Sequence, residues 1–123
     1  MLTEVQEQKL KTNMIEFIEE LIEIIKDKEL RLKIALETYF NEYGGLVLDI
    51  TNNSIGYTTN KTNYVRSYSK WDDDCMYKRL KDNKNVYEVD IMLDILKNKE
   101  LIKEVINKEI NRRDNLINEI LGG

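Results

Sequence analysis

The 123-residue chain contains no histidine and no proline, and it has a single cysteine, Cys75. Without histidine it lacks the usual general base, the Ser–His and Cys–His nucleophile pairs and a common zinc ligand. One cysteine rules out an internal disulfide, which favours a reducing compartment, and we expect a cytoplasmic location. These absences argue against an enzyme, because its site would rest on Asp, Glu, Tyr or Lys alone.

Long apolar runs and an excess of positive charge are also missing. No stretch of about 18 apolar residues is present, so we expect no membrane span. The start of the chain lacks the basic region and apolar stretch of a secretory signal. The net charge of -4 gives no basis for binding a DNA or RNA polymer, which requires cations to displace counterions. With no repeat or linker, residues 1–123 are expected to form a single domain.

What the chain does have is a long N-terminal segment with helical periodicity. Thr3 and Gln6 have the form of a capping box, and the pattern predicts one long helix from Thr3 to Tyr43, or two helices broken near residues 26–28. Two adjacent apolar stripes run along this segment. One consists of Ile15, Ile18, Ile22, Ile25, Leu32, Leu36, Tyr39 and Tyr43, and the other of Leu10, Met14, Phe17, Leu21 and Ile24. Two stripes exceed what one packing partner can cover, so we expect a homo-oligomer, a dimer or higher, through residues 10–43.

The spacing of apolar residues changes from a helical to an alternating pattern after Gly44 and Gly45, where the helix is expected to end. Residues 46–50, 55–59 and 64–68 read as three strands with short connections, and Gly56 is a candidate bulge. Helices are then predicted over residues 74–80 and 86–96 and, with Asn98 as a candidate cap, from there to residue 121. The fold class is therefore α+β: a long N-terminal helix or two, a three-stranded antiparallel meander, and C-terminal helices.

Arg113 is the most informative candidate for a functional site. It lies between Ile110 and Ile117 on the apolar stripe of the last predicted helix, where an aliphatic side chain is expected. One interpretation is that it extends to water and pairs with Glu109. The other is that it binds an anion, because a guanidinium matches carboxylate or phosphate in two-point fashion. Arg112 points about 100° away, so the two arginines could serve a ligand and a partner subunit.

Aromatic residues gather in the middle third of the chain and form a second candidate site. Tyr64, Tyr68 and Arg66 share one side of a predicted strand, and Trp71 follows it. Tyrosines suit a half-buried sheet, but with an arginine they could also stack on a base or sugar.

The acidic run Asp72, Asp73 and Asp74 invites a metal hypothesis, but the EF-hand spacing is absent, and a charge cluster at a helix start explains it. Cys75 has no histidine partner, so we interpret it as a packing residue or an inert thiol. No phosphate loop or nucleophile elbow is present. We expect no metal, no cofactor and no catalysis.

The layout of a long N-terminal helix, an aromatic-rich meander and a C-terminal helix with Arg112 and Arg113 resembles the phage anti-Thoeris sponge family. The resemblance also covers chain length and the wealth of Ile, Lys, Asn and Tyr. It implies a phage protein, acting in the host cytosol, that sequesters a cyclic ADP-ribose-type immune signal in pockets at subunit interfaces. The ligand would be a small, anionic, nucleotide-like molecule. The alternative is a protein-interaction module, an inhibitor or immunity protein, whose acidic helical surface masks a basic partner enzyme.

Overall fold

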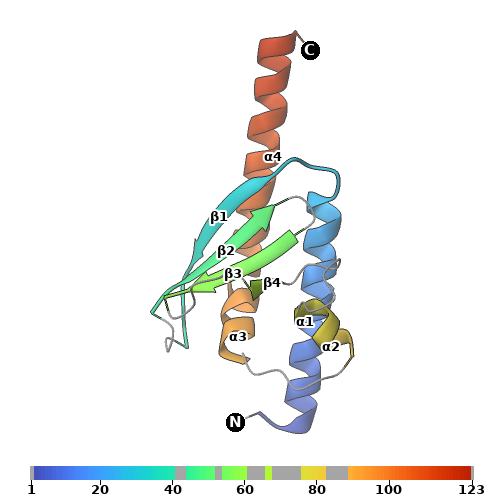
Figure 1. The fold of residues 1–123 in the computed structure, drawn as a ribbon, viewed down its shortest axis with the longest axis vertical. Helices are drawn as coiled ribbons and strands as arrows, with labels where there is room; N and C mark the ends of the chain where they lie inside the picture. The colour runs from blue at the N-terminus through green and yellow to red at the C-terminus, as the bar shows by residue number, and fades with distance from the viewer. Residues whose placement is uncertain are drawn as a thin grey trace.

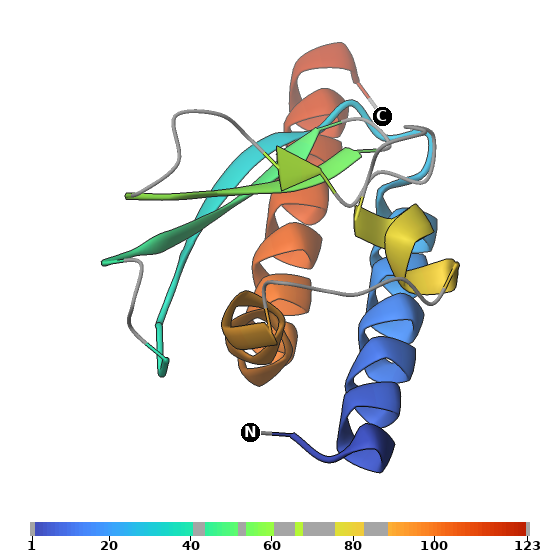
Figure 2. The ribbon, with the colours of Figure 1, turned by 60° about the horizontal axis from the view of Figure 1, so that its bottom comes forward.

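The structure is a computed structural model that describes residues 2–40, 44–51, 54–60, 66–67, 76–82 and 89–122. Within these ranges, a long helix is followed by four strands and three further helices: α1 (Glu4–Ile25), β1 (Arg31–Leu36), β2 (Leu46–Thr51), β3 (Ser54–Thr59), β4 (Arg66–Ser67), α2 (Met76–Lys81), α3 (Val89–Lys97) and α4 (Lys99–Leu121). The strands form an antiparallel sheet in the order β1-β2-β3-β4 (Figure 1). Figure 2 shows α1, α3 and α4 on one side of it. The predicted α+β class is confirmed.

Helix α1 begins as the sequence predicts, and it ends where the alternative with two helices placed the break. The Thr3 amide donates to Gln6 Oε1 at 3.0 Å, and the Gln6 amide donates to Thr3 Oγ1 at 3.1 Å, which completes the capping box. The helix stops at Ile25, and Asp27 follows with a φ of 60°, a left-handed conformation that aspartate tolerates. Of the two alternatives, a single helix to Tyr43 is therefore wrong, and the break at residues 26–28 is confirmed.

The second predicted helix is wrong, because residues 31–36 form strand β1. Leu32 and Leu36 are four residues apart, a spacing that fits both a helix face and one face of a strand. Ile34 lies between them and shares their face, while Arg31, Lys33 and Ala35 are exposed. This alternation has the period of two that a strand requires.

Both apolar stripes of α1 are covered by the chain itself. The buried apolar side chains of this helix are Leu10, Met14, Phe17, Ile18, Leu21, Ile22 and Ile25, with Ile15 and Ile24 packed partly against them. α1 contacts α2, α3, α4 and strand β3, so several elements share the task of covering it. The apolar stripes of α1 therefore no longer require a second subunit to cover residues 10–43. Residues 41–43 lie outside the described part of the chain.

Strands β1, β2 and β3 pair in regular register. β1 pairs with β2 through Ile34 and Leu48, and β2 pairs with β3 through Leu48 and Tyr57, which puts these three buried side chains in one row. The predicted strands over residues 46–50 and 55–59 are confirmed. Gly56 pairs in register with Asp49 and with Ser67, so no bulge occurs there. Of the third predicted strand, only residues 66–67 are described as β4.

The last two helices meet at a polar junction that fixes the direction of α4. Asn98 stands at the N-cap position, but its side chain makes no capping hydrogen bond. Its Nδ2 instead donates to the Glu37 carbonyl at 2.8 Å and to the Asp94 carbonyl at 2.7 Å. Asp94 is buried and its Oδ1 accepts from the Tyr39 amide at 2.6 Å. These bonds tie the segment after β1 to the corner between α3 and α4.

Helix α2 docks on α1 through Tyr77, and removal of its hydroxyl is expected to destabilise the fold by about 1 kcal/mol. The buried Tyr77 donates to Glu19 Oε1 at 2.6 Å, and Lys81 Nζ lies 3.2 Å from the same oxygen. Burial and the bond to Glu19 raise the pKa of Tyr77. The contribution of the hydroxyl is therefore complete below pH 10 and is lost as the pH rises through the raised pKa.

Urea unfolding of Tyr77→Phe beside the natural chain measures this contribution, and the gap between the two is expected to narrow above pH 10. The exposed Tyr39→Phe serves as the matched control and should cost little, because the Tyr39 hydroxyl makes an exposed bond to Glu37. Equal stability of Tyr77→Phe and the natural chain at neutral pH would refute the role of this bond.

Candidate functional site

The C-terminal part of α4 extends beyond the rest of the molecule, as Figure 1 shows. Ile102 and Ile106, in its first half, are completely buried. Exposure then rises along the helix, from 39% at Leu116 and 51% at Ile117 to 71% at Ile120 and 76% at Leu121. We call these four residues the apolar tail. The arginine pair Arg112 and Arg113 lies where the helix leaves the body.

Arg112 is held by an ion pair on its own helix. Its Nη2 lies 2.7 Å from Glu109 Oε1 and its Nε lies 3.1 Å from Glu109 Oε2, so the contact is two-pronged. The hydrogen bond from Arg112 lowers the pKa of Glu109, and the charge of Arg113 adds to this effect. The interpretation that Arg113 pairs with Glu109 is thus not what the geometry shows, because Arg112 occupies that carboxylate.

Arg113 is half-buried and, within the described residues, makes neither an ion pair nor a hydrogen bond of its side chain. It borders a hollow of about 550 Å³ that is lined by Glu29, Arg31, Glu109, Arg112 and Arg113. We call this space the arginine hollow. A second hollow of about 320 Å³ continues from the two arginines along the apolar tail. The carboxylates that line the arginine hollow and another hollow that Arg113 also borders are those of Glu29, Glu109, Asp27 and Asp114. None of them forms an ion pair with Arg113 among the described residues, so its N–H donors remain available to an external anion, and Arg113 is a candidate contact for one.

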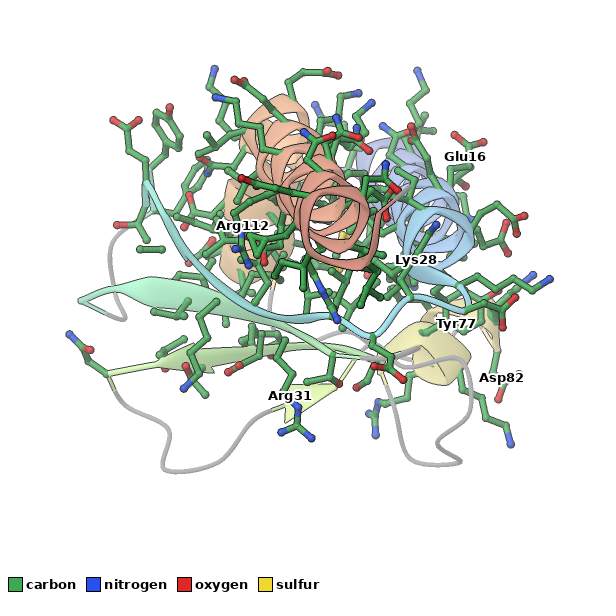
Figure 3. The ribbon with its side chains drawn as sticks, turned by 90° about the horizontal axis from the view of Figure 1, so that it is seen from above. Glu16, Lys28, Arg31, Tyr77, Asp82 and Arg112 are labelled. Carbon is green, nitrogen blue, oxygen red and sulfur yellow. The ribbon has the colours of Figure 1, made fainter. Side chains whose placement is uncertain are left out.

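The arginine hollow is also lined by one acidic residue, Glu29, and by a third arginine, Arg31. Glu29, in the connection between α1 and β1, places a carboxylate on the wall opposite α4. Arg31 is exposed at the first position of β1, and Figure 3 shows its side chain on the other side of the sheet from Arg112. Arg31 therefore contributes to the rim of the hollow, and its guanidinium does not join the arginine pair.

The structure does not bring all predicted site residues together. Arg112 and Arg113 lie beside the start of β1, at one edge of the sheet, whereas Arg66 lies in β4, at the opposite edge. Arg112 and Arg113 were expected to serve different partners because their side chains leave the helix in different directions, yet both border the same hollow. Tyr64, Tyr68 and Trp71 fall outside the described residues, as do Asp72, Asp73, Asp74 and Cys75. The aromatic half of the predicted site has no structural description.

Sequence reasoning missed the arginine hollow's acidic wall and the exposure of the apolar tail. Leu116, Ile117, Ile120 and Leu121 follow helical spacing, which on its own reads as a buried face. Glu29 lies in a segment that the helical interpretation treated as part of a helix. Its distance in sequence from Arg113 leaves no local signal that could have connected the two.

Two further searches of the described residues give negative findings. Among these residues, no group of three or more His, Cys, Asp or Glu side chains is arranged to hold a metal ion. None of the helices in the described ranges combines the length and apolar character that crossing a bilayer requires. Comparison of the chain with protein-family models, with curated proteins and with solved structures found no match.

Proposed function

We propose that this chain is a non-catalytic binding protein that holds a small, phosphate-bearing, nucleotide-derived anion against Arg113 and Arg112. The observation that carries the proposal is the half-buried Arg113, which borders an open hollow and, among the described residues, forms no ion pair with the carboxylates that line it. A guanidinium offers a rigid set of N–H donors that fits two phosphate oxygens at once. Arg112 adds a second cation beside it, although Glu109 neutralises part of its charge.

The size and charge of the hollow define the ligand further. About 550 Å³ is within the range of pockets that hold small organic ligands, and it suits a nucleotide better than an inorganic ion alone. Glu29 on the opposite wall disfavours a second anionic group there and can instead accept hydrogen bonds from sugar hydroxyls. The ligand we propose therefore carries its phosphate at one end and its hydroxyl groups at the other.

A cyclic ADP-ribose-type immune signal is the specific ligand that the resemblance to anti-Thoeris sponges implies. It combines phosphates with ribose hydroxyls, which matches the chemistry of the hollow. In this proposal a phage-encoded protein removes the signal from the host cytosol by tight binding and so inhibits antiviral defence. The lack of histidine and of a recognisable nucleophile supports binding without turnover.

Isothermal calorimetry with cyclic ADP-ribose isomers and cyclic oligonucleotides tests the proposal. At least one ligand is expected to bind, and Arg113→Gln is expected to weaken it by about tenfold or more, as the loss of a charge-assisted contact predicts. Lys108→Gln is the matched control, because Lys108 is an exposed cation on the same helix that pairs with Glu104. Both variants are expected to melt like the natural chain.

Mass spectrometry of the ligand after incubation distinguishes storage from catalysis, since a bound signal is recovered unchanged. No heat with any of these ligands removes the proposal. Capture of a stoichiometric protein from a host lysate would then favour the alternative, an interaction module that masks a partner enzyme.

A further inference from the structure

The apolar tail is too exposed to be part of the core and too regular to be incidental. Leu116, Ile117, Ile120 and Leu121 lie on adjoining lines of α4, and this surface continues the face that Ile102 and Ile106 bury lower down. Together the four side chains present an apolar patch on the order of 400 Å², a size that marks interaction sites on soluble proteins. From the geometry we infer that the tail binds the same tail of a second copy, with the two helices antiparallel.

The charges beside the tail fit an antiparallel pair. Arg112 and Glu119 are seven residues apart, two turns of helix, so both lie on the same flank of the apolar surface. In an antiparallel pair related by a two-fold axis the same flanks meet. An axis that passes close to Leu116 sets Arg112 of each copy opposite Glu119 of the partner subunit, and symmetry repeats this contact.

The alternative direction is disfavoured by the same charges. A parallel, in-register pair would place two Arg113 side chains next to each other on the shared surface and would bring together two negative helix ends. The antiparallel pair instead sets Arg112 and Arg113 beside residues 118–119 of the partner subunit, which include the partner's Glu119. The exposed Arg112 side chain is available for this contact even while Glu109 holds one side of it.

The size of the patch sets the expected strength of the pair. Two tails with their flanking charges bury a surface at the low end of specific interfaces, where association is reversible and weak. The apolar contact of the pair comes from the tail, so the dimer is expected to form without the proposed anion, although Arg112 would serve both the pair and the anion.

Sedimentation equilibrium of the whole chain, from about 1 μM to about 1 mM, tests the inference. We expect a monomer–dimer equilibrium that Ile120→Asp weakens by roughly tenfold or more. Leu101→Asp is the matched control, since Leu101 is another exposed aliphatic residue of α4 but lies outside the tail. Neither change is expected to unfold the chain, because Ile120 is 71% exposed and Leu101 is 43% exposed.

A charge exchange tests the direction of the pair. Arg112→Glu and Glu119→Arg are each expected to weaken the dimer, and the two changes in one chain are expected to restore it to within about threefold, since the opposite-charge contact is rebuilt. A chain that stays monomeric at every concentration overturns the inference and assigns the tail to a different protein. A dimer that none of these variants weakens, or one that the double variant fails to restore, overturns it as well.

Discussion

Ile18→Asp is expected to unfold the chain. Ile18 is 1% exposed and belongs to the cluster where α1 meets the sheet and the later helices. The change removes a buried aliphatic side chain and leaves a carboxylate among apolar neighbours without a partner. Such a change costs more than about 4 kcal/mol, a large part of the stability of a domain this size. Far-UV circular dichroism and thermal melting provide the measurement.

Val5→Asp is the matched control for this prediction. It introduces the same side chain into the same helix, but Val5 is 65% exposed, so stability is expected to change by less than about 0.5 kcal/mol. The distinguishing result would be an Ile18→Asp chain that melts normally but sediments as a smaller species. That result would mean that Ile18 faces a second subunit, as the sequence alone led us to expect, and that the intramolecular core is misplaced.

Asp94→Ala is expected to destabilise the chain by about 3 kcal/mol, the second largest effect. The Asp94 carboxylate is 2% exposed and accepts the Tyr39 amide at 2.6 Å, in the polar junction that joins α3 and α4 to the segment after β1. Alanine removes the acceptor and leaves the amide of Tyr39 without that bond, and bonds to charged groups are worth about 1.5–3 kcal/mol. Denaturant unfolding gives the value directly.

Two companion variants separate the lost bond from a general effect of losing an acid. Asp94→Asn keeps an oxygen in the same place and is expected to recover more than half of the loss. Asp90→Ala removes a carboxylate one helical turn earlier, where the side chain is half-buried in the first turn of α3, and should cost less than about 1 kcal/mol. If alanine at residue 94 is as stable as alanine at residue 90, the junction does not hold α4 in place.

Local signals in the sequence carried much of the fold. The capping box at Thr3, the alternation in residues 46–50 and 55–59, and the helical spacing after residue 98 each depend on near neighbours, and each prediction is confirmed. The error at residues 31–36 has a physical cause. Leu32 and Leu36 satisfy two periods at once, and the exposed residues between them decide in favour of a strand.

The candidate site depends on long-range placement, which one sequence does not encode visibly. Arg113 stood out because it interrupts an apolar stripe, and the structure does put it at the edge of a hollow. Its neighbour across that hollow, Glu29, is far away along the chain. The covering of α1 by later helices was equally hidden, and this is why its two stripes looked like an intermolecular surface.

The position of α1 has a consequence for biosynthesis. Its buried face contacts α3 and α4, which are made later than α1, so these elements do not yet cover the new helix when it leaves the ribosome. At about 5–20 residues per second, translation from residue 26 to residue 121 takes several seconds. During that time the apolar face of α1 is exposed to the cell, where a holding chaperone can bind it and truncated products can aggregate through it.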